Sequence, residues 1–414
     1  MNKNIKLAVA GAIFAAASAA NAGIIIPAGE WTLDINGNVN AFGTITRIDK
    51  AQTIQGDGGV GGAVAEGNPR SIHTGLLPAW LGFTGKTRQN DLDVEFTISM
   101  QPTVGGAGYH GDGSNGDAAN GVNTPFLNRQ TYVSFGDKSW GSIKLGKDIG
   151  IYASDAILND MTLLGVGGAS HLGSNSSVST TTGGIGTGYQ YAAWKGQIAY
   201  TTPNFNGFQA TAGITNPNMF GNNGVAQDRF GLEGKASYSF AGDAASGKVW
   251  VSGATYDVDA SRTDSWGSTR ISAYDIGLNV NFANFGLTAY AYDGRGNGST
   301  ALGLSGLSST GAKRDGDGGY IQLTYVLPSK TKVGVSYGES KLDLAAGETA
   351  ATAAITGGTA GALIQQNERV TVGAYHPLTK HLNLVAEYND IKSKAHGGNR
   401  NEYSSVSLGA ILFF

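Results

Sequence analysis

The residues of this chain best suited to chemistry are charged side chains in and around one long segment, residues 148–193. Three carboxylates lie within the segment, and most of the amines lie in the stretches that flank it. Groups of opposite sign either form ion pairs that hold such a segment, or face water and act on dissolved ions through their field. Plain solvation of a polar surface would also explain them. The set comprises Asp148, Asp155, Asp160, Lys144, Lys195, Lys235 and Glu233.

Metal binding is the second chemistry to weigh. Asp112 and Asp117, and again Asp315 and Asp317, lie in Gly-rich stretches that could offer oxygen ligands to Ca²⁺. Neither stretch has a full calcium-loop pattern, and flexible Gly-Asp turns explain both more simply. The histidines lie in or next to loops and have no metal-ligand spacing, so we expect no metal and no cofactor.

Alternation with a period of two defines the elements that must position these groups. From Leu92 to Met100, large apolar residues alternate with Asp, Glu, Thr and Ser, and Trp31–Ile48 has the same pattern. The polar face needs water, and the apolar face needs lipid or a core. Counting such stretches predicts strands at 31–48, 77–84, 92–100, 129–136, 141–147, 194–202, 207–214, 229–240, 248–257, 271–282, 285–293, 320–327, 332–340, 369–376, 382–391 and 402–414.

The connections between these strands alternate between short turns and long polar loops. Short periplasmic turns and long external loops are typical of outer-membrane barrels. We therefore predict an all-β fold, a closed antiparallel transmembrane β-barrel of 16 strands, or of 18 if 148–193 or 341–368 hides a pair. A soluble β-sandwich would not explain the loop asymmetry. The long connections are 49–72, 104–128, 148–193, 215–228, 258–270, 294–319, 341–368 and 392–401.

Both ends of the chain agree with export to a membrane. Lys3 and Lys6 precede an apolar stretch and a small-residue cleavage site, the pattern of a secretory signal peptide. We expect residues 1–22 to be removed and residues 23–414 to form the barrel. The last strand ends on Phe414, an aromatic residue of the kind that lies at the bilayer interface.

Composition excludes some partners and some modes of membrane insertion. The formal net charge is −3, and it falls to −5 without Lys3 and Lys6. Without a cluster of basic residues, we expect no nucleic-acid partner. Beyond the signal peptide, no apolar run reaches the roughly 18 residues of a membrane-spanning helix. The mean hydropathy of −0.12 is uninformative, because the two faces of alternating strands cancel.

Several segments resemble the general-diffusion porins of Gram-negative bacteria, of the Neisseria-like and Burkholderia-like type. Leu81–Lys86, Asn128–Gly136, Gly141–Lys147, Ile198–Phe208 and Val372–Lys380 are similar to motifs of that family, in the same order. The resemblance implies a homotrimer in the bacterial outer membrane, in contact with lipid and lipopolysaccharide. It also implies that the third external loop folds into the lumen, and that the barrel-assembly machinery recognises the terminal aromatic residue.

This resemblance implies a water-filled channel for passive diffusion of ions and small hydrophilic solutes, and no enzyme activity. Segment 148–193 matches the third loop in position, so its three aspartates and the four other charged residues named above are candidates for the pore constriction. Its leucines could instead pack on a neighbouring loop or subunit. A porin specific for a sugar or small organic acid is the alternative function, and a barrel enzyme is the third. The aromatic residues that could guide such a solute are Trp80, Tyr290, Tyr292 and Tyr320.

Strand parity also predicts where charges point. Arg129 falls on the lipid-facing parity, so we expect it at the rim with its head in water. Acidic residues on the lumen parity outnumber lysines, which predicts a weak preference for cations. The acids are Asp34, Asp93, Glu95, Glu233, Asp275 and Glu387, and the lysines are Lys86, Lys144, Lys195 and Lys235.

Replacing Phe414 by Asp tests the role of the terminal aromatic residue. The substitution puts a charge where the interface favours an aromatic ring, so export should continue while insertion into the outer membrane decreases. Cell fractionation with immunoblotting measures both steps. An undiminished barrel yield from the Asp variant would contradict the assignment.

Overall fold

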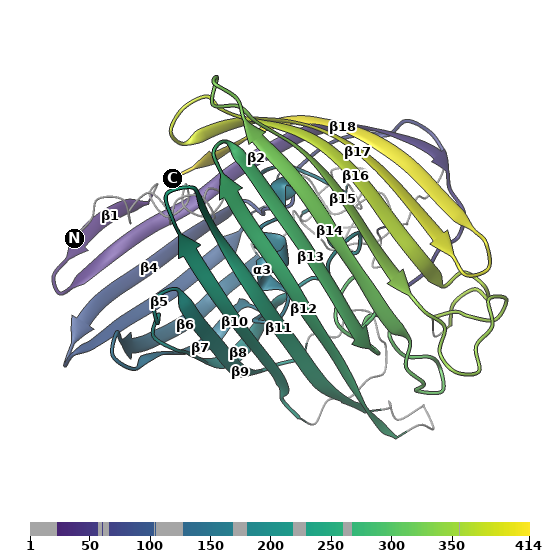
Figure 1. Ribbon diagram of the computed structural model, residues 1–414, viewed down its shortest axis with the longest axis horizontal. Helices are drawn as coiled ribbons and strands as arrows, with labels where there is room; N and C mark the ends of the chain where they lie inside the picture. Colours follow the sequence, from purple (N-terminus) through teal and green to yellow (C-terminus); the bar gives the residue numbers. More distant parts are fainter. Residues whose placement is uncertain are drawn as a thin grey trace, which may run out of the picture.

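The computed structural model describes residues 23–56, 60, 66–102, 104, 127–168, 180–217, 229–259, 267–355 and 357–414. The expected signal peptide and the Asp112–Asp117 stretch lie outside these ranges. Within them, no helix combines the length and the apolar character that crossing a bilayer requires. The described chain is almost entirely β-structure, with one short α-helix and one 3₁₀-helix in the same connection (Figure 1).

Sixteen antiparallel strands, β2 and β4–β18, form one closed barrel. Each strand pairs with its neighbours in the chain, and β18 closes the ring on β2, with Ala410 opposite Ala41. The strands are β2 (Trp31–Lys50), β4 (Trp80–Gln89), β5 (Leu92–Gln101), β6 (Leu127–Asp137), β7 (Gly141–Ile149), β8 (Trp194–Thr201), β9 (Phe208–Thr215), β10 (Gly231–Ala241), β11 (Ala245–Asp259), β12 (Ser268–Phe282), β13 (Phe285–Arg295), β14 (Asp315–Val326), β15 (Lys332–Leu342), β16 (Ile364–Pro377), β17 (Leu382–Ala395) and β18 (Arg400–Phe413). The predicted closed barrel of 16 strands is confirmed.

Two further strands pair with β2 but do not belong to the ring of barrel strands. β1 (Ile24–Ala28) pairs with the first part of β2, with Ile24 opposite Ile35. β3 (Arg70–His73) pairs with its middle, with Ile45 opposite Arg70, in line with β4 on the same edge. Neither extra strand lies in 148–193 or 341–368, the two places where a hidden pair was considered.

Tight turns connect the strands at one end of the barrel. Asn90 and Asp91 have φ values of 48° and 61°, the left-handed conformations that a two-residue hairpin turn requires. Long connections lie at the opposite end, with one difference from the prediction. β17 and β18 extend to Ala395 and from Arg400, so the connection expected at 392–401 is the short turn 396–399. The two strands are longer than predicted because the alternation continues past Ile391 in polar residues. These residues of β17 pair with β18 beyond the apolar belt.

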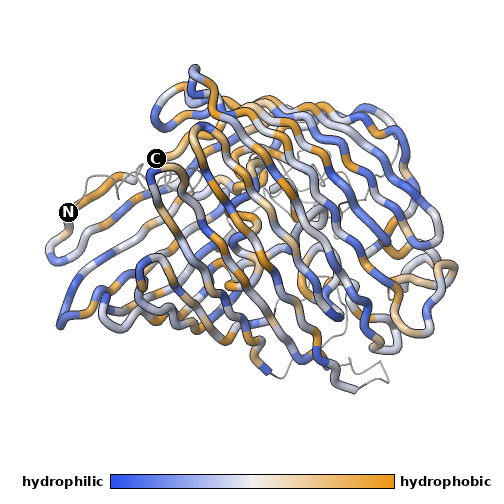
Figure 2. The backbone as a smooth tube through the Cα atoms, viewed as in Figure 1, coloured by the Kyte–Doolittle hydropathy of each residue, from blue (hydrophilic) through white to orange (hydrophobic). Residues whose placement is uncertain are grey.

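The outer face of the barrel is apolar, as the alternation predicts. Val133, Ile198, Leu232, Ile276 and Leu408 all point outward and are between 41% and 61% exposed. Figure 2 shows the alternation as orange and blue bands along the strands. At the turn end, Phe282, Phe285 and Tyr325 form an aromatic group, with ring centroids 5.5 and 4.6 Å apart. An apolar belt that ends in aromatic residues is the surface of a protein that spans a bilayer.

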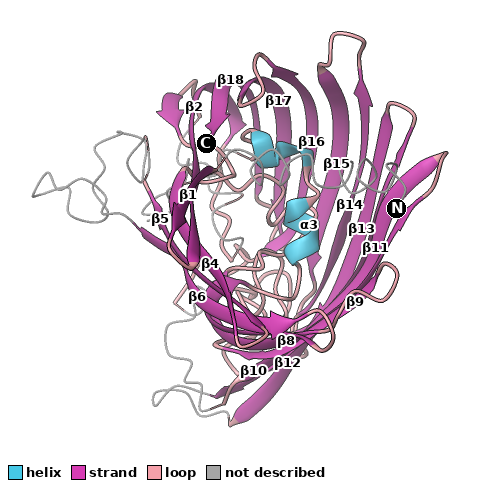
Figure 3. Cartoon of the chain, turned by 90° about the vertical axis from the view of Figure 1, so that its left-hand side faces the viewer, coloured by secondary structure: helices cyan, strands magenta, loops and turns pink. Residues whose placement is uncertain are grey.

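The interior is packed by residues from the wall and from the connection between β7 and β8. Figure 3 shows the helix of this connection, α3 (Ser154–Leu158), within the ring of strands. Ile157 and Leu163 of the connection pack against Trp250, Tyr290 and Tyr320 of the wall. Because burying a large apolar side chain stabilises by about 1.5–3 kcal/mol, these contacts hold the connection against the wall.

The chain closes with Phe414 next to β2. Its backbone N–H donates to the Gly37 carbonyl over 3.1 Å, and the Gly37 N–H donates to its carbonyl over 2.8 Å. The Phe414 ring lies over Gly37, where a Cβ would come within 2.8 Å of it. A glycine at this position therefore allows the terminal ring to cover the outer face of β2.

Heat should change the electrophoretic mobility of the folded protein. Because every strand of the ring is paired on both edges, the barrel has no open edge at which detergent could begin to unfold it. Unboiled samples should therefore migrate as a compact species and boiled samples at the mass of the extended chain. Equal mobility of the two samples in gel electrophoresis would contradict a stable closed barrel.

Candidate functional site

The connection between β7 and β8, residues 150–193, carries two of the seven predicted site residues, Asp155 and Asp160, and the other five lie on β7, β8 and β10. The connection begins with α3 and continues into a 3₁₀-helix, η1 (Met161–Leu164). Asp160 caps η1, because its side chain accepts a hydrogen bond of 2.9 Å from the Thr162 N–H. Ala153, before α3, has a φ of 61°, so the chain turns sharply as it leaves the wall. We call residues 150–168 and 180–193 the inner segment.

Asp155 joins the inner segment to strands β10 and β11. Its carboxylate lies 2.9 Å from Lys235 Nζ and also pairs with Lys248 Nζ. Burial of this loop residue opposes its ionisation, but the two ammonium groups outweigh burial and hold the pKa of the carboxyl below its ordinary value. One carboxylate therefore neutralises only part of the positive charge of the two lysines.

Glu233, on strand β10 of the wall, binds the start of the inner segment. Its carboxylate lies 2.7 Å from Lys195 Nζ and accepts hydrogen bonds from the N–H groups of Ile151 and Tyr152 over 2.7 and 2.9 Å. The Tyr256 hydroxyl donates to the same carboxylate. The Lys195 and Glu233 side chains are 4% and 0% exposed, so this pair is buried beneath the segment.

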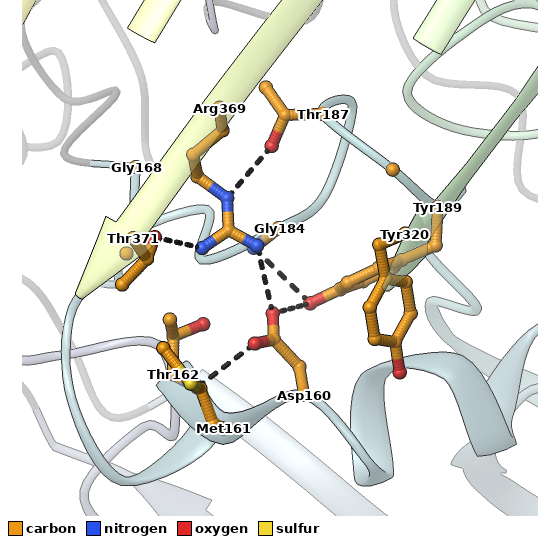
Figure 4. Close-up of polar contacts among 12 residues, drawn as sticks. Asp160, Met161, Thr162, Gly168, Gly184, Thr187, Tyr189, Tyr320, Arg369 and Thr371 are labelled. Atoms are coloured by element: carbon orange, nitrogen blue, oxygen red, sulfur yellow. Dashed lines mark hydrogen bonds and ion pairs between the residues drawn. The ribbon is translucent and has the colours of Figure 1, made fainter. Parts of the chain in front are cut away.

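Arg369 holds the other half of the inner segment (Figure 4). Its Nη2 lies 3.6 Å from Asp160, and its Nε donates to Thr187 Oγ1 over 3.2 Å. The Tyr189 hydroxyl donates to Asp160 over 2.8 Å. A Cβ on Gly184 would lie 2.6 Å from Arg369 Nη2, so only glycine lets the backbone approach the guanidinium this closely. The wall arginine thus joins the first described part of the segment, at Asp160, to the second, at Thr187.

Glu387 and Gln322 anchor the middle of the segment. Glu387 accepts from the N–H groups of Val166 and Gly167 over 2.9 and 2.8 Å. Gln322 Oε1 accepts from the Met161 N–H over 2.7 Å. These wall side chains satisfy backbone groups that no helix or sheet pairs, which a buried connection requires.

A second group of charges follows the wall from β4 to β7. Lys86 lies 3.2 Å from Glu95, and the Tyr132 hydroxyl donates to Glu95 over 3.0 Å. Lys144 Nζ lies 4.7 Å from the centre of the Tyr132 ring and pairs with Asp148. Asp148 also accepts a hydrogen bond of 3.0 Å from Gln130 Nε2.

The prediction that Arg129 lies at a lipid-facing rim is wrong. Ser99 is opposite Gln130 and Met100 is opposite Asn128, so Arg129 is the additional residue of a β-bulge. A bulge redirects the side chain that strict alternation assigns to the other face. The guanidinium is buried between two indole rings, 4.6 Å from the centre of Trp80 and 4.2 Å from that of Trp194.

Sequence reasoning missed a second connection that packs against the inner segment, residues 296–314. The Tyr191 N–H donates to the Thr300 carbonyl over 2.7 Å, and Gln190 Nε2 donates to the Asn297 carbonyl over 2.9 Å. Arg314, fully buried, forms a two-pronged ion pair with Glu348 over 2.9 and 2.5 Å. The apolar residues in Ala301–Leu304 were the available signal, since an exposed loop tip rarely carries them.

The seven predicted residues fall into four separate groups. Asp155 meets Lys235, Glu233 meets Lys195, and Asp148 meets Lys144, while Asp160 pairs with Arg369, which was not predicted. In the described part of the chain, no three His, Asp or Glu side chains converge to hold a metal ion. The arrangement can position a segment and present charge to water.

A closed barrel with an apolar belt and a polar, charged interior defines an outer-membrane channel. The profile of the Gram-negative porin family matches residues 7–396. The chain therefore belongs to the Gram-negative porin family, whose members form outer-membrane channels for passive diffusion. A search of curated proteins finds no match.

Solved outer-membrane proteins share the fold at low sequence identity. The outer membrane channel DcaP of Acinetobacter baumannii has a TM-score of 0.63 and 15% identity, over 95% of this chain and 100% of that chain. OmpF of Salmonella typhi, in complex with daunomycin, has a TM-score of 0.56 and 16% identity, over 94% and 100%. OmpT of Vibrio cholerae has a TM-score of 0.53 and 12% identity, over 94% and 100%.

Replacing Arg369 by Ala should destabilise the inner segment. The substitution leaves the buried Asp160 without its cation, a loss that typically costs about 3–5 kcal/mol. We expect a lower midpoint of thermal unfolding, measured by circular dichroism in detergent. Arg400→Ala is the matched control, because Arg400 is exposed on the outer face and forms no ion pair with a described residue. Equal midpoints for the two variants would contradict the anchoring role.

Proposed function

We propose that the inner segment narrows the channel and sets which ions and small hydrophilic solutes diffuse through it. The observation that carries the proposal is that wall side chains fasten the segment along its length. Asp155, Glu233 and Arg369 take part in ion pairs that join it to the wall, or that lie directly beneath it. Because the segment is fixed, the passage beside it has a defined width and a defined set of charges.

We propose further that the channel is general and catalyses no reaction. The aromatic residues considered as a guide for one solute, Tyr290, Tyr292 and Tyr320, are 3–5% exposed and pack under the inner segment. Trp80 covers Arg129 and is 9% exposed. Side chains at these positions do not contact a passing sugar or organic acid, which favours general diffusion over a substrate-specific porin. The interior carboxylates of the predicted set are engaged by lysine or arginine, an arrangement suited to positioning rather than to acid–base chemistry.

Export, assembly and oligomeric state belong to the same proposal. Residues 1–22 would be cleaved as a signal peptide, and Phe414 would be recognised by the barrel-assembly machinery. A homotrimer is supported by OmpT of Vibrio cholerae, described in a trimer form and similar in fold with a TM-score of 0.53 and 12% identity. The exposed apolar belt would contact lipid and, at the loop end, lipopolysaccharide.

Chemical modification of a single cysteine tests whether the inner segment lines the passage. The chain has no Cys. Helix α3 lies within the ring of strands (Figure 3), and Leu158 at its end is 41% exposed. Leu158→Cys, treated with a bulky water-soluble thiosulfonate, should lose a substantial part of its single-channel conductance in planar bilayers, because the adduct fills part of the passage.

Lys341→Cys is the matched control for this experiment. Lys341 lies on the outward face of β15 with a side chain that is 46% exposed, so its cysteine should react without changing the conductance. If labelled Leu158→Cys conducts like the unlabelled protein, the inner segment does not narrow the passage.

A further inference from the structure

The lysines and carboxylates of the interior are unequally exposed to water. In the Lys144–Asp148 pair, the lysine side chain is 35% exposed and the aspartate 8%. Lys235 and Lys248 are 21% and 23% exposed, whereas their shared partner Asp155 is 5% exposed. In each pair, the ammonium group is the member that faces water and the carboxylate lies behind it.

Lys144 and Lys235 lie on the part of the wall that the inner segment leaves open, and Lys248 lies next to it on β11. The inward-facing side chains of β6, β7, β9 and β10 are partly exposed at the level of Lys144 and Lys235, although those of β8 between them are buried from Lys195 to Ala199. The inward-facing side chains of β16–β18 are buried under the segment. At the turn end, this open wall continues into a cavity of about 790 Å³. Inward side chains that line the cavity include Thr32, Lys86, Glu95, Ser134, Ser142 and Gln209. We call this open wall and cavity the conduit.

The charge count at the middle of the conduit is also unequal. Asp155 serves two lysines, so that group of three carries a net positive charge. Arg129 adds a guanidinium that has no carboxylate within ion-pair distance among the described residues. Of the other interior acids near this level, Glu233 is neutralised by Lys195, and Asp275 is 3% exposed and hydrogen-bonded to Ser252 and Tyr290.

On the basis of the proposed function, we propose that the conduit favours small anions over cations. Lys144, Lys235 and Lys248 are the groups that contact these anions. The interaction between charges falls with distance and is screened within about 10 Å at 0.1 M salt, so the charges that meet a solute first dominate. The candidate solutes are inorganic anions and small carboxylates, which an ammonium group can contact while both remain hydrated. The negative net charge of the whole chain does not determine the preference, because it also counts charges outside the conduit that a solute does not contact.

Mixed charges at the turn end do not reverse this preference. Lys86 is 59% exposed and Glu95 28%, so the lysine is again the more accessible member of its pair. Arg88 is bonded to Asp93 and Asp137, so that group of three carries a net negative charge, in the part of the conduit away from the inner segment. A wide, hydrated mouth discriminates less than the narrow level beside the inner segment.

Reversal potentials in a tenfold KCl gradient across a planar bilayer test the inference. The native channel should have a chloride-to-potassium permeability ratio above one. Lys144→Gln should lower this ratio about twofold, because it removes one water-facing charge while Gln130 still bonds to Asp148. Lys144→Arg should keep the native ratio, since it keeps the charge.

Lys147→Gln is the matched control, because Lys147 lies on the same strand but on the outer face, where it donates to the Asn128 carbonyl. It should leave the ratio unchanged. A native ratio below one, or equal ratios for Lys144→Gln and Lys147→Gln in channels of native conductance, would overturn the inference and leave the channel function intact. Absence of salt-dependent channel steps would overturn the proposed function as well.

Discussion

The structure depends on one constraint: no backbone N–H or C=O can face hydrocarbon without a partner. A sheet meets this constraint only if its first and last strands pair, and here β18 pairs with β2 from Glu402 to Phe413. The closing pair also explains the position of Phe414, whose backbone groups bond to Gly37. Once the ring is closed, the outer face must be apolar and the inner face is free to be polar.

A ring of sixteen strands is too wide to be filled by its own side chains, and this creates the need for an inner segment. A connection that enters the barrel brings unpaired backbone groups with it, and the wall supplies their partners. Glu233, Gln322 and Glu387 accept backbone N–H groups from three successive parts of the segment. Glu233 and Glu387, carboxylates that would be costly to bury alone, become anchors because each bonds to several donors.

The anchoring also decides which charges remain in contact with water. The segment covers carboxylates and leaves the longer lysine side chains reaching past it, as at Lys144 and Lys235. Lysine has a flexible apolar stem that allows its ammonium group to reach water while the stem packs. Fixing the segment and setting the accessible charge are therefore consequences of the same contacts.

Much of the fold followed from alternation alone. The inward positions of Lys144, Lys235 and Glu233, the strand number and the apolar belt could be predicted, because side-chain direction along a regular strand is a local property. The position of Arg129 could not be predicted, because one additional residue in a bulge changes the parity of the strand. No residue in Asn128–Thr131 indicates the bulge. Arg369 was not predicted as a partner of Asp160, and the packing of 296–314 on the inner segment was not predicted either, since both join stretches far apart in the chain. The sequence by itself determined which face a charge takes on a regular strand. Only the tertiary structure decided which charges pair and which reach water, because pairing and exposure depend on what distant segments cover.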